Sequence, residues 1–227
     1  MTLETVLDNI FWHTLTGPHA KFATGAGGAR RYAAGFPPIL GFAAAAAPDF
    51  AALAPYCAPG EHFYCDRWSG AAPADWRIDA ESTMFKMLWD APLPAADAAP
   101  DARPLGAGHT AQMLDLAALT QPGPFGPRNL ELGEYFGLFE GTRLIAMAGE
   151  RCHAGTLREI SGVCTHPDFQ GRGLAWRLMA KLIRRQRQRG ETPFLHVMSD
   201  NDRARRLYRR MGFRDYRETT VRVVSRR

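Results

Sequence analysis

The chain of 227 residues lacks a long apolar run and a leader-like N-terminus. No segment reaches the ~18 consecutive apolar residues that a membrane-spanning helix needs, because Asp49 interrupts the apolar stretch that starts at Ile39. The first fifteen residues contain Glu4 and Asp8 but no basic residue, which is not the pattern of a secretory signal. We therefore expect a cytoplasmic protein that does not enter a membrane.

Cysteine is also scarce. The four cysteines form no CxxC pair, and a chain of this length does not need disulfides to build a core. Cys57 and Cys65 enclose His62, but this spacing matches no common zinc site. We predict that the protein binds no metal.

Positive charge is scarce in the first part of the chain and concentrated in the last. Residues 1–150 hold nine Lys/Arg and sixteen Asp/Glu, a net charge of −7, whereas residues 151–227 hold nineteen and seven, a net charge of +12. A basic region can bind nucleic acid or a phosphate-bearing cofactor. The basic residues lack the interleaved aromatic side chains of a stacking platform, which makes nucleic acid the weaker alternative. Solvated helix faces account for most of these charges.

A segment rich in proline and alanine, Ala91 to Pro104, has no apolar periodicity and is typical of a linker. We therefore predict an N-terminal region, residues 1–102, and a second domain, residues 103–227. Residues 2–15 are expected to be helical, with Leu3, Val6, Leu7, Ile10 and Phe11 on one side. Gly25 to Gly28 is expected to be a plain loop. The N-terminal region contains no recognisable catalytic constellation.

Residues 103–227 contain clearer patterns. Apolar periodicity and turn residues predict, in order, a helix over 109–119, strands over 135–140, 143–151 and 157–165, a helix over 171–189, a strand over 194–198, a helix over 202–211 and one or two strands over 213–224. This order predicts an α/β (α+β) fold with a mixed, mostly antiparallel central sheet flanked by helices. The N-terminal region would add a further α/β part.

The most informative segment joins the strand over 157–165 to the following helix. Gly171 and Gly173 precede an amphipathic helix whose apolar stripe includes Leu174, Leu178 and Leu182. The start of a helix presents unpaired N–H groups and the positive end of its dipole. Glycine has no Cβ, so an anion can approach the backbone closely. The segment therefore predicts a site for a pyrophosphate, with the charge of Arg172 nearby.

The same residues resemble a known family. The run Gln170, Gly171, Arg172, Gly173, Leu174, Ala175 is similar to the Gln/Arg-x-x-Gly-x-Gly/Ala motif of the GNAT superfamily of N-acyltransferases, and the similarity extends over roughly residues 103–227. The resemblance implies that these six residues bind the pyrophosphate of acetyl-CoA. It also implies that Val163, Cys164 and Thr165 bind the pantetheine arm through their backbone groups, on a strand that splays from its neighbour. Because tandem members exist in the superfamily, residues 1–102 are interpreted as a degenerate second acyltransferase fold without a cofactor loop.

Acyl transfer to an amine requires a base for the amine and an acid for the departing thiolate. The candidate base is Glu159, which lies eleven residues before Gln170, the spacing of the catalytic glutamate in histone-type members of the superfamily. Strand alternation predicts that Glu159, Ser161, Val163 and Thr165 share one face. The alternative is an ion-paired glutamate beside Arg143 or Arg158.

The candidate acid is Tyr208. Residues 201–213 resemble the Asn-x-x-Ala-x-x-x-Tyr-x-x-x-Gly-Phe signature of the superfamily, and helical spacing places Ala204, Leu207, Tyr208 and Met211 on the inward face. The Tyr208 hydroxyl would then reach the sulfur of CoA. Asn201 is expected to begin this helix and to touch the cofactor. The alternative for Tyr208 is a core tyrosine with a structural hydrogen bond.

Cys164 raises the alternative of an acyl-cysteine intermediate. It alternates away from Glu159 and no histidine is placed to activate it, and His153 and His196 are interpreted as structural residues. We therefore predict direct transfer from acetyl-CoA to a primary amine in a ternary complex. The alternative from another class is an acyl-CoA sensor without catalysis. The sequence leaves open whether the acceptor is a small amine or a peptide or protein amine, and whether the protein forms a homodimer.

Overall fold

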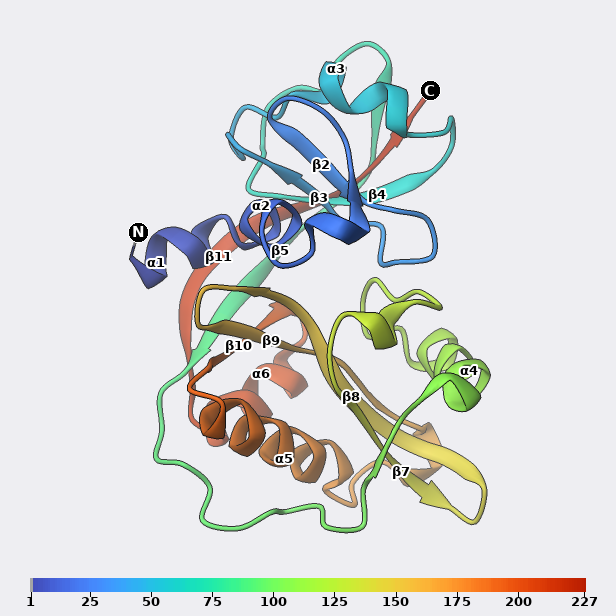
Figure 1. Ribbon diagram of the computed structural model, residues 1–227, viewed down its shortest axis with the longest axis vertical. Helices are drawn as coiled ribbons and strands as arrows, with labels where there is room; N and C mark the ends of the chain where they lie inside the picture. Colours follow the sequence, from blue (N-terminus) through green and yellow to red (C-terminus); the bar gives the residue numbers. More distant parts are fainter. Residues whose placement is uncertain (1) are drawn as a thin grey trace.

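The computed structural model describes residues 2–227 and is built on one large sheet (Figure 1). Eight strands lie in the order β4-β11-β5-β10-β9-β8-β7-β6, and a separate sheet has the order β1-β2-β3. Among the described strands, only β9 and β10 pair in parallel. The predicted fold class, a mostly antiparallel sheet with helices on its faces, is confirmed.

Before the linker, the chain forms α1 (Leu3–Asp8), α2 (Ile10–Thr16), β1 (Ala23–Thr24), β2 (Ala29–Tyr32), β3 (Leu40–Phe42), α3 (Phe50–Leu53), β4 (His62–Asp66) and β5 (Trp76–Trp89). The predicted helix over 2–15 is broken at Asn9, whose side-chain amide donates to the Phe42 carbonyl at 2.8 Å. Gly25 to Gly28 form the turn between β1 and β2.

After the linker, the chain forms β6 (Arg103–Pro104), α4 (Thr110–Thr120), β7 (Tyr135–Glu140), β8 (Arg143–Ala154), β9 (Leu157–Thr165), α5 (Leu174–Gln188), β10 (Thr192–Met198), α6 (Asp202–Arg210) and β11 (Phe213–Arg226). These elements follow the predicted order closely. The helix predicted to start at Gly171 starts at Leu174, so the two glycines remain outside it. Residues 213–226 form one long strand.

The large sheet takes strands from both sides of the predicted boundary at residue 102. β5 lies between β10 and β11 and runs antiparallel to both, with Leu88 opposite Phe194 and Met84 opposite Thr219. The first half of β5 is mostly exposed, and its second half is mostly buried on both faces. The sequence therefore lacks the regular apolar-polar alternation that would predict a strand here. Residues 2–89 thus form a small sheet and also complete the large one. Their interpretation as a degenerate second acyltransferase fold stays a prediction.

The predicted linker runs along α5 and is held there by the cations of that helix (Figure 1). Arg177 donates to the Ala98 carbonyl at 3.1 Å and pairs with Asp101. Lys181 pairs with Asp97, and Arg184 donates to the Pro94 carbonyl at 2.6 Å. The basic face of α5 therefore fixes a segment that has few apolar anchors of its own.

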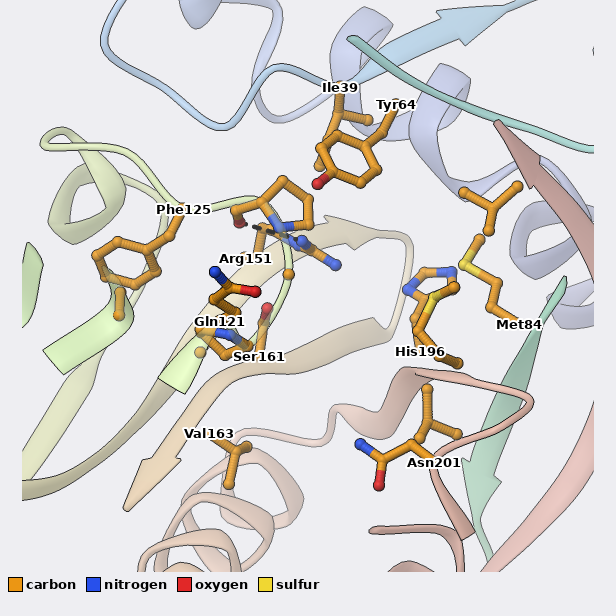
Figure 2. Close-up of a pocket in the computed structure, with 18 of the residues that line it drawn as sticks. Ile39, Tyr64, Met84, Gln121, Phe125, Arg151, Ser161, Val163, His196 and Asn201 are labelled. Carbon is orange, nitrogen blue, oxygen red and sulfur yellow. Dashed lines mark hydrogen bonds between the residues drawn. The ribbon is translucent and has the colours of Figure 1, made fainter. Parts of the chain in front are cut away.

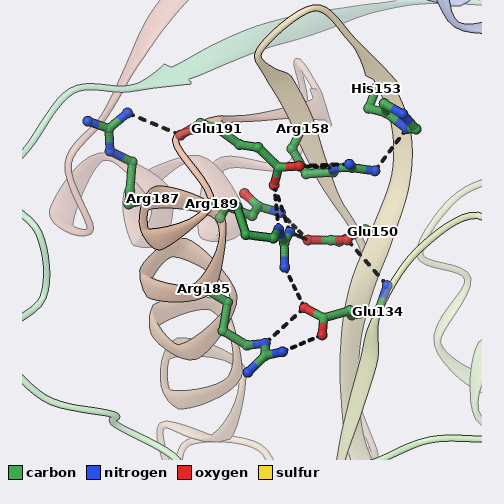
Figure 3. A network of polar contacts seen from close by, with 9 residues as sticks. Glu134, Glu150, His153, Arg158, Arg185, Arg187, Arg189 and Glu191 are labelled. Carbon is green, nitrogen blue, oxygen red and sulfur yellow. Dashed lines mark hydrogen bonds and ion pairs between the residues drawn. The ribbon is translucent and has the colours of Figure 1, made fainter. Parts of the chain in front are cut away.

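The remaining cations of α5 and its C-terminal end contact acidic residues of neighbouring elements (Figure 3). Arg185 and Arg189 both pair with Glu134, and Arg189 also pairs with Glu150 and Glu191. These ion pairs offset part of the uneven distribution of charge along the chain. This pairing weakens the nucleic-acid alternative, because these guanidinium groups already have carboxylate partners.

Helices cover both faces of the large sheet. α5 packs on one face around Leu178, Leu182 and Ile160. On the other face, α1 and α2 pack against β5, β8, β9 and β10, and α4 packs against β8 and β9. The site described below lies where two strands of this sheet separate.

A β-bulge in β9 changes which side chains face each side of the sheet. The register passes from Met147 opposite Cys164 to Gly149 opposite Ser161, so β9 has one residue more than β8 in this interval. Gly162 adopts a left-handed backbone with φ of +61° at this point. Val163 consequently packs with the α5 cluster and Cys164 with the α4 cluster. The prediction that Glu159, Ser161, Val163 and Thr165 share one face is wrong, because simple alternation ends at the bulge.

The parallel ladder between β9 and β10 is short. Thr192 to Phe194 pair with Leu157 to Glu159, and β10 then continues beside β5 alone. The edge of β9 beyond Glu159 therefore has no strand partner on the β10 side. The splay that the resemblance implied is present in this fold.

The bulge yields a prediction about stability. A Cβ at position 162 would lie 3.0 Å from Tyr135 Cε1 and 3.2 Å from Phe125 Cε2, whereas one at Gly155, which has a similar φ of +56°, would meet nothing within 4 Å. Both alanine variants carry the strain of a left-handed residue, but only Gly162→Ala also collides with packed rings. We expect Gly162→Ala to lower the free energy of unfolding by about 1–2 kcal/mol more than Gly155→Ala. Urea denaturation measures both, and equal losses would show that Tyr135 and Phe125 do not hold the bulge.

Candidate active site

A cavity of about 920 Å³ opens where β9 and β10 separate. Residues 160–163 of β9 line one side, and residues 196–198 of β10 line the other. In Figure 2, Val163 and Asn201 lie toward one end and Ile39 and Tyr64 toward the other, with Arg151 and His196 between them. The cavity thus connects the splayed strands of the second half with residues of the N-terminal region.

The predicted cofactor loop precedes α5 and has an open backbone. Gly173 is the N-cap, with φ of +72°, and no side chain caps the helix. Six consecutive backbone N–H groups have no hydrogen-bond acceptor among residues 2–227. They belong to Gly171, Arg172, Gly173, Leu174, Ala175 and Trp176. A Cβ built on Gly171 or Gly173 would meet nothing within 4 Å. Six free amides in an unobstructed loop are suited to bind an anion.

Side chains around the loop fix its position without covering its amides. Gln170 Oε1 accepts from Arg203 Nη1 at 2.8 Å, which ties the loop to the start of α6. The Arg172 guanidinium lies over the Phe169 ring, 4.7 Å from its centroid. This contact keeps a positive charge beside the loop.

Tyr208 and Asn201 both line the cavity. The Tyr208 ring packs edge-on against Phe213, 6.1 Å between centroids, and its hydroxyl forms no hydrogen bond to the described residues. Burial raises the pKa of Tyr208 to about 12, so the phenol stays protonated at neutral pH. Asn201 caps α6 by accepting from the Ala204 amide at 3.1 Å. The predicted capping by Asn201 is confirmed, and the structural hydrogen bond considered for Tyr208 is not formed.

The three residues predicted along the pantetheine path are placed differently from one another. Val163 lines the cavity, whereas Cys164 is buried against α4. Burial raises the pKa of the Cys164 thiol to about 12, which disfavours a thiolate nucleophile. Thr165 has a buried hydroxyl that lacks a hydrogen-bond partner among residues 2–227.

The carboxylate of Glu159 is buried and accepts four hydrogen bonds. Its Oε1 accepts from Arg151 Nη2 at 2.6 Å and from His196 Nδ1 at 2.7 Å. Its Oε2 accepts from Arg151 Nε at 3.0 Å and from the Cys152 amide at 3.1 Å. Burial alone would raise the pKa of Glu159, but the Arg151 charge and His196 outweigh it and hold this pKa well below its usual range. The expected partners Arg143 and Arg158 bond elsewhere, to His166 and Glu191 respectively.

Arg151 and His196 line the cavity but were not predicted as site residues. Arg151 lies three residues before the end of β8, and His196 is a polar residue between apolar neighbours in β10. Their roles depend on Glu159, which is 8 residues from Arg151 and 37 residues from His196 in the sequence. The only signal in the sequence is the presence of a histidine at a position where apolar neighbours predict burial.

A sequence profile of the FR47-like protein family matches residues 135–223. The chain is 33% identical to a protein of Novosphingobium aromaticivorans DSM 12444 assigned to the GNAT acetyltransferase family, with a TM-score of 0.88 over 97% of this chain and 98% of that one. The chain therefore belongs to the GNAT family of acetyltransferases. Among curated protein sequences, none matches it.

More distant structures share the fold. A GCN5-related N-acetyltransferase-like protein of Streptococcus suis is 15% identical, with a TM-score of 0.61 over 96% of this chain and 92% of that one. A GNAT-family acetyltransferase of Colwellia psychrerythraea is 16% identical, with a TM-score of 0.51 over 67% of this chain and 58% of that one. The first of these relatives extends the likeness to the N-terminal region. Within residues 2–227, no helix is long and apolar enough to cross a bilayer.

Proposed function

We propose that this protein is an N-acyltransferase that transfers acetyl from acetyl-CoA to a primary amine within a ternary complex. The observation that carries the proposal is the row of six free amides at Gly171 to Trp176, next to a cavity between splayed strands. The amides would hold the diphosphate of CoA, with the charge of Arg172 beside it. The free edge of β9 after Glu159 would hold the pantetheine arm and place the thioester in the cavity.

The chemistry removes two protons from the acceptor nitrogen and delivers one to the departing sulfur. The acceptor ammonium loses one proton, and the amine nitrogen attacks the thioester carbonyl to form the C–N bond. The C–S bond then breaks, and the sulfur leaves with the electron pair. We propose that Tyr208 donates its phenolic proton to this sulfur, and that the second proton of the nitrogen returns to Tyr208 through solvent. A protonated phenol on the cavity wall supports this role.

The far end of the cavity supports a proposal about the acceptor. Its walls from the N-terminal region and the sheet include the apolar side chains of Phe11, Ile39, Met84, Val221 and Val223. The carboxylate there, Glu81, is paired with Arg222 at 2.6 Å. An apolar wall without an unpaired charge suits an aliphatic or aromatic amine better than a polyamine. We therefore propose a small primary amine with an apolar body as the acceptor.

The first test concerns the cofactor loop. Gly173→Ala places a Cβ among the free amides, whereas Gly190→Ala adds a similarly strained residue, with φ of +76° and no neighbour within 4 Å, at the other end of the same helix. We expect Gly173→Ala to weaken CoA binding about tenfold or more and Gly190→Ala to leave it within about twofold. Isothermal titration with CoA measures both affinities. Unchanged affinity in Gly173→Ala would remove the loop from the cofactor site.

The second test concerns Tyr208. Tyr208→Phe removes only the hydroxyl, which forms no hydrogen bond within the described part of the chain. We expect kcat to fall about 100-fold while CoA affinity stays within about twofold, because the hydroxyl acts on the departing sulfur rather than on binding. Steady-state kinetics and titration with CoA check this. An undiminished rate would exclude Tyr208 as the acid, and absence of turnover in the wild type with all amines would favour the acyl-CoA sensor.

The third test concerns the acceptor. Pentylamine and 1,5-diaminopentane have the same chain length and differ in one terminal ammonium. Burying that second charge against the apolar wall is unfavourable, so we expect kcat/KM for pentylamine to be about tenfold higher or more. Release of free CoA thiol reports both rates. A preference for the diamine would contradict the proposed acceptor class.

A further inference from the structure

The hydrogen bonds of Glu159 leave it unable to accept a proton from a substrate. A carboxylate offers about four lone-pair positions, and each of them is used by Arg151, His196 or the Cys152 amide. Its side chain does not line the cavity, in contrast to that of His196. A base must reach the proton that it removes, directly or through one water. Glu159 meets neither condition, so a different group must act on the amine.

His196 has the properties that Glu159 lacks. Glu159 is a carboxylate and accepts, so His196 Nδ1 carries the proton of that hydrogen bond, and in the neutral imidazole Nε2 keeps a free lone pair. Nε2 is shielded from solvent and has no hydrogen-bond partner among residues 2–227. The side chain reaches into the cavity (Figure 2). A buried acceptor without a partner gains a hydrogen bond when a donor such as an ammonium enters.

We propose that His196 is the catalytic base of this enzyme and that Glu159, held by Arg151, is its positioning residue. This inference rests on the proposed acyl transfer. His196 Nε2 takes one proton from the acceptor ammonium, which leaves the neutral amine to attack the thioester carbonyl. The imidazolium forms opposite the Glu159 carboxylate, which stabilises it, and then releases the proton to solvent. No further reactant is needed.

The ring of His196 is held firmly. It stacks at a tilt against Phe11 of α2, 5.2 Å between centroids, and edge-on against Phe194 of its own strand, 5.7 Å between centroids. Glu159 fixes the rotation of the ring through Nδ1. A base whose position is fixed before the substrate arrives loses little freedom on reaction.

The charges around His196 are balanced. Lys86 of β5 lies opposite His196 in the ladder, and its ammonium is fully buried against Asp66 of β4 at 2.7 Å. Arg151 of β8 is bound to Glu159 of β9. The other titratable groups on the cavity wall are the phenols of Tyr64 and Tyr208, and Glu81, which pairs with Arg222. No unpaired cation from these elements opposes an imidazolium, whose direct partner is a carboxylate.

The test compares two histidine variants. His196→Gln keeps a donor for Glu159 but removes the base, whereas His153→Gln changes a histidine outside the cavity that bonds to Arg158. We expect His196→Gln to lower kcat with the amine about 100-fold and to abolish the rise of rate with pH, with CoA affinity within about twofold of the wild type. His153→Gln should retain the wild-type rate. Full activity of a folded His196→Gln would overturn the inference.

Two further variants separate a chemical role from a structural one. In His196→Ala, added imidazole should restore much of the lost rate by occupying the vacated space; no restoration in a folded protein would count against a base at this position. In Glu159→Gln the rise of rate should move to lower pH, because the imidazolium loses its anionic partner, and an unmoved profile would contradict the positioning role.

Wild-type turnover and CoA titration distinguish failure of this inference from failure of the proposed function. If the wild type transfers no acetyl group, the proposed function fails, whereas active His196 variants with normal CoA binding defeat this inference alone.

Discussion

The separation of β9 from β10 beyond Glu159 and Phe194 is the constraint on which the site depends. The backbone ladder stops there, and a bulge at Gly162 carries β9 onward with its own pairing to β8. The space between the two strands forms the cavity. The unpaired edge of β9 is the proposed binding path of the pantetheine arm. β5, which comes from the first half of the chain, pairs with β10 on its other side. This pairing holds β10 in place beyond Phe194, where β10 no longer pairs with β9.

Side chains connect the strands where the backbone ladder between β9 and β10 ends. Arg151, Glu159 and His196 belong to β8, β9 and β10, and their hydrogen bonds join these three strands where the ladder between β9 and β10 ends. Removing one member of a buried ionic group would leave the others uncompensated, which makes the network a structural element as well as a chemical one. The proposed roles follow from these contacts. Glu159 uses its oxygen atoms to join the strands, whereas His196 keeps Nε2 available for the substrate.

The sequence predicted the elements of residues 103–227 because their periodicity is local and their ends carry glycine and proline. It also predicted the open loop at Gly171 to Ala175, since a strand, two glycines and an amphipathic helix follow one another directly. It could not predict β5 as a central strand, because its pairing with β10 and β11 spans more than a hundred residues. The pair of Glu159 and His196 was missed because the two residues are 37 positions apart and lie on different strands. The bulge at Gly162 made the predicted face of β9 wrong. Location in the cell, oligomeric state and the nature of the acceptor stay predictions.

The most direct measurement of the central claim is an amide NMR titration of the ¹⁵N-labelled protein with CoA and, separately, with pantetheine. If the free amides before and at the start of α5 bind the diphosphate, the resonances of Gly171 to Trp176 should move strongly with CoA and hardly at all with pantetheine, which lacks the diphosphate. Resonances of Ile160 to Val163 should respond to both. Binding of CoA that leaves the signals of Gly171 to Trp176 in place would contradict the account.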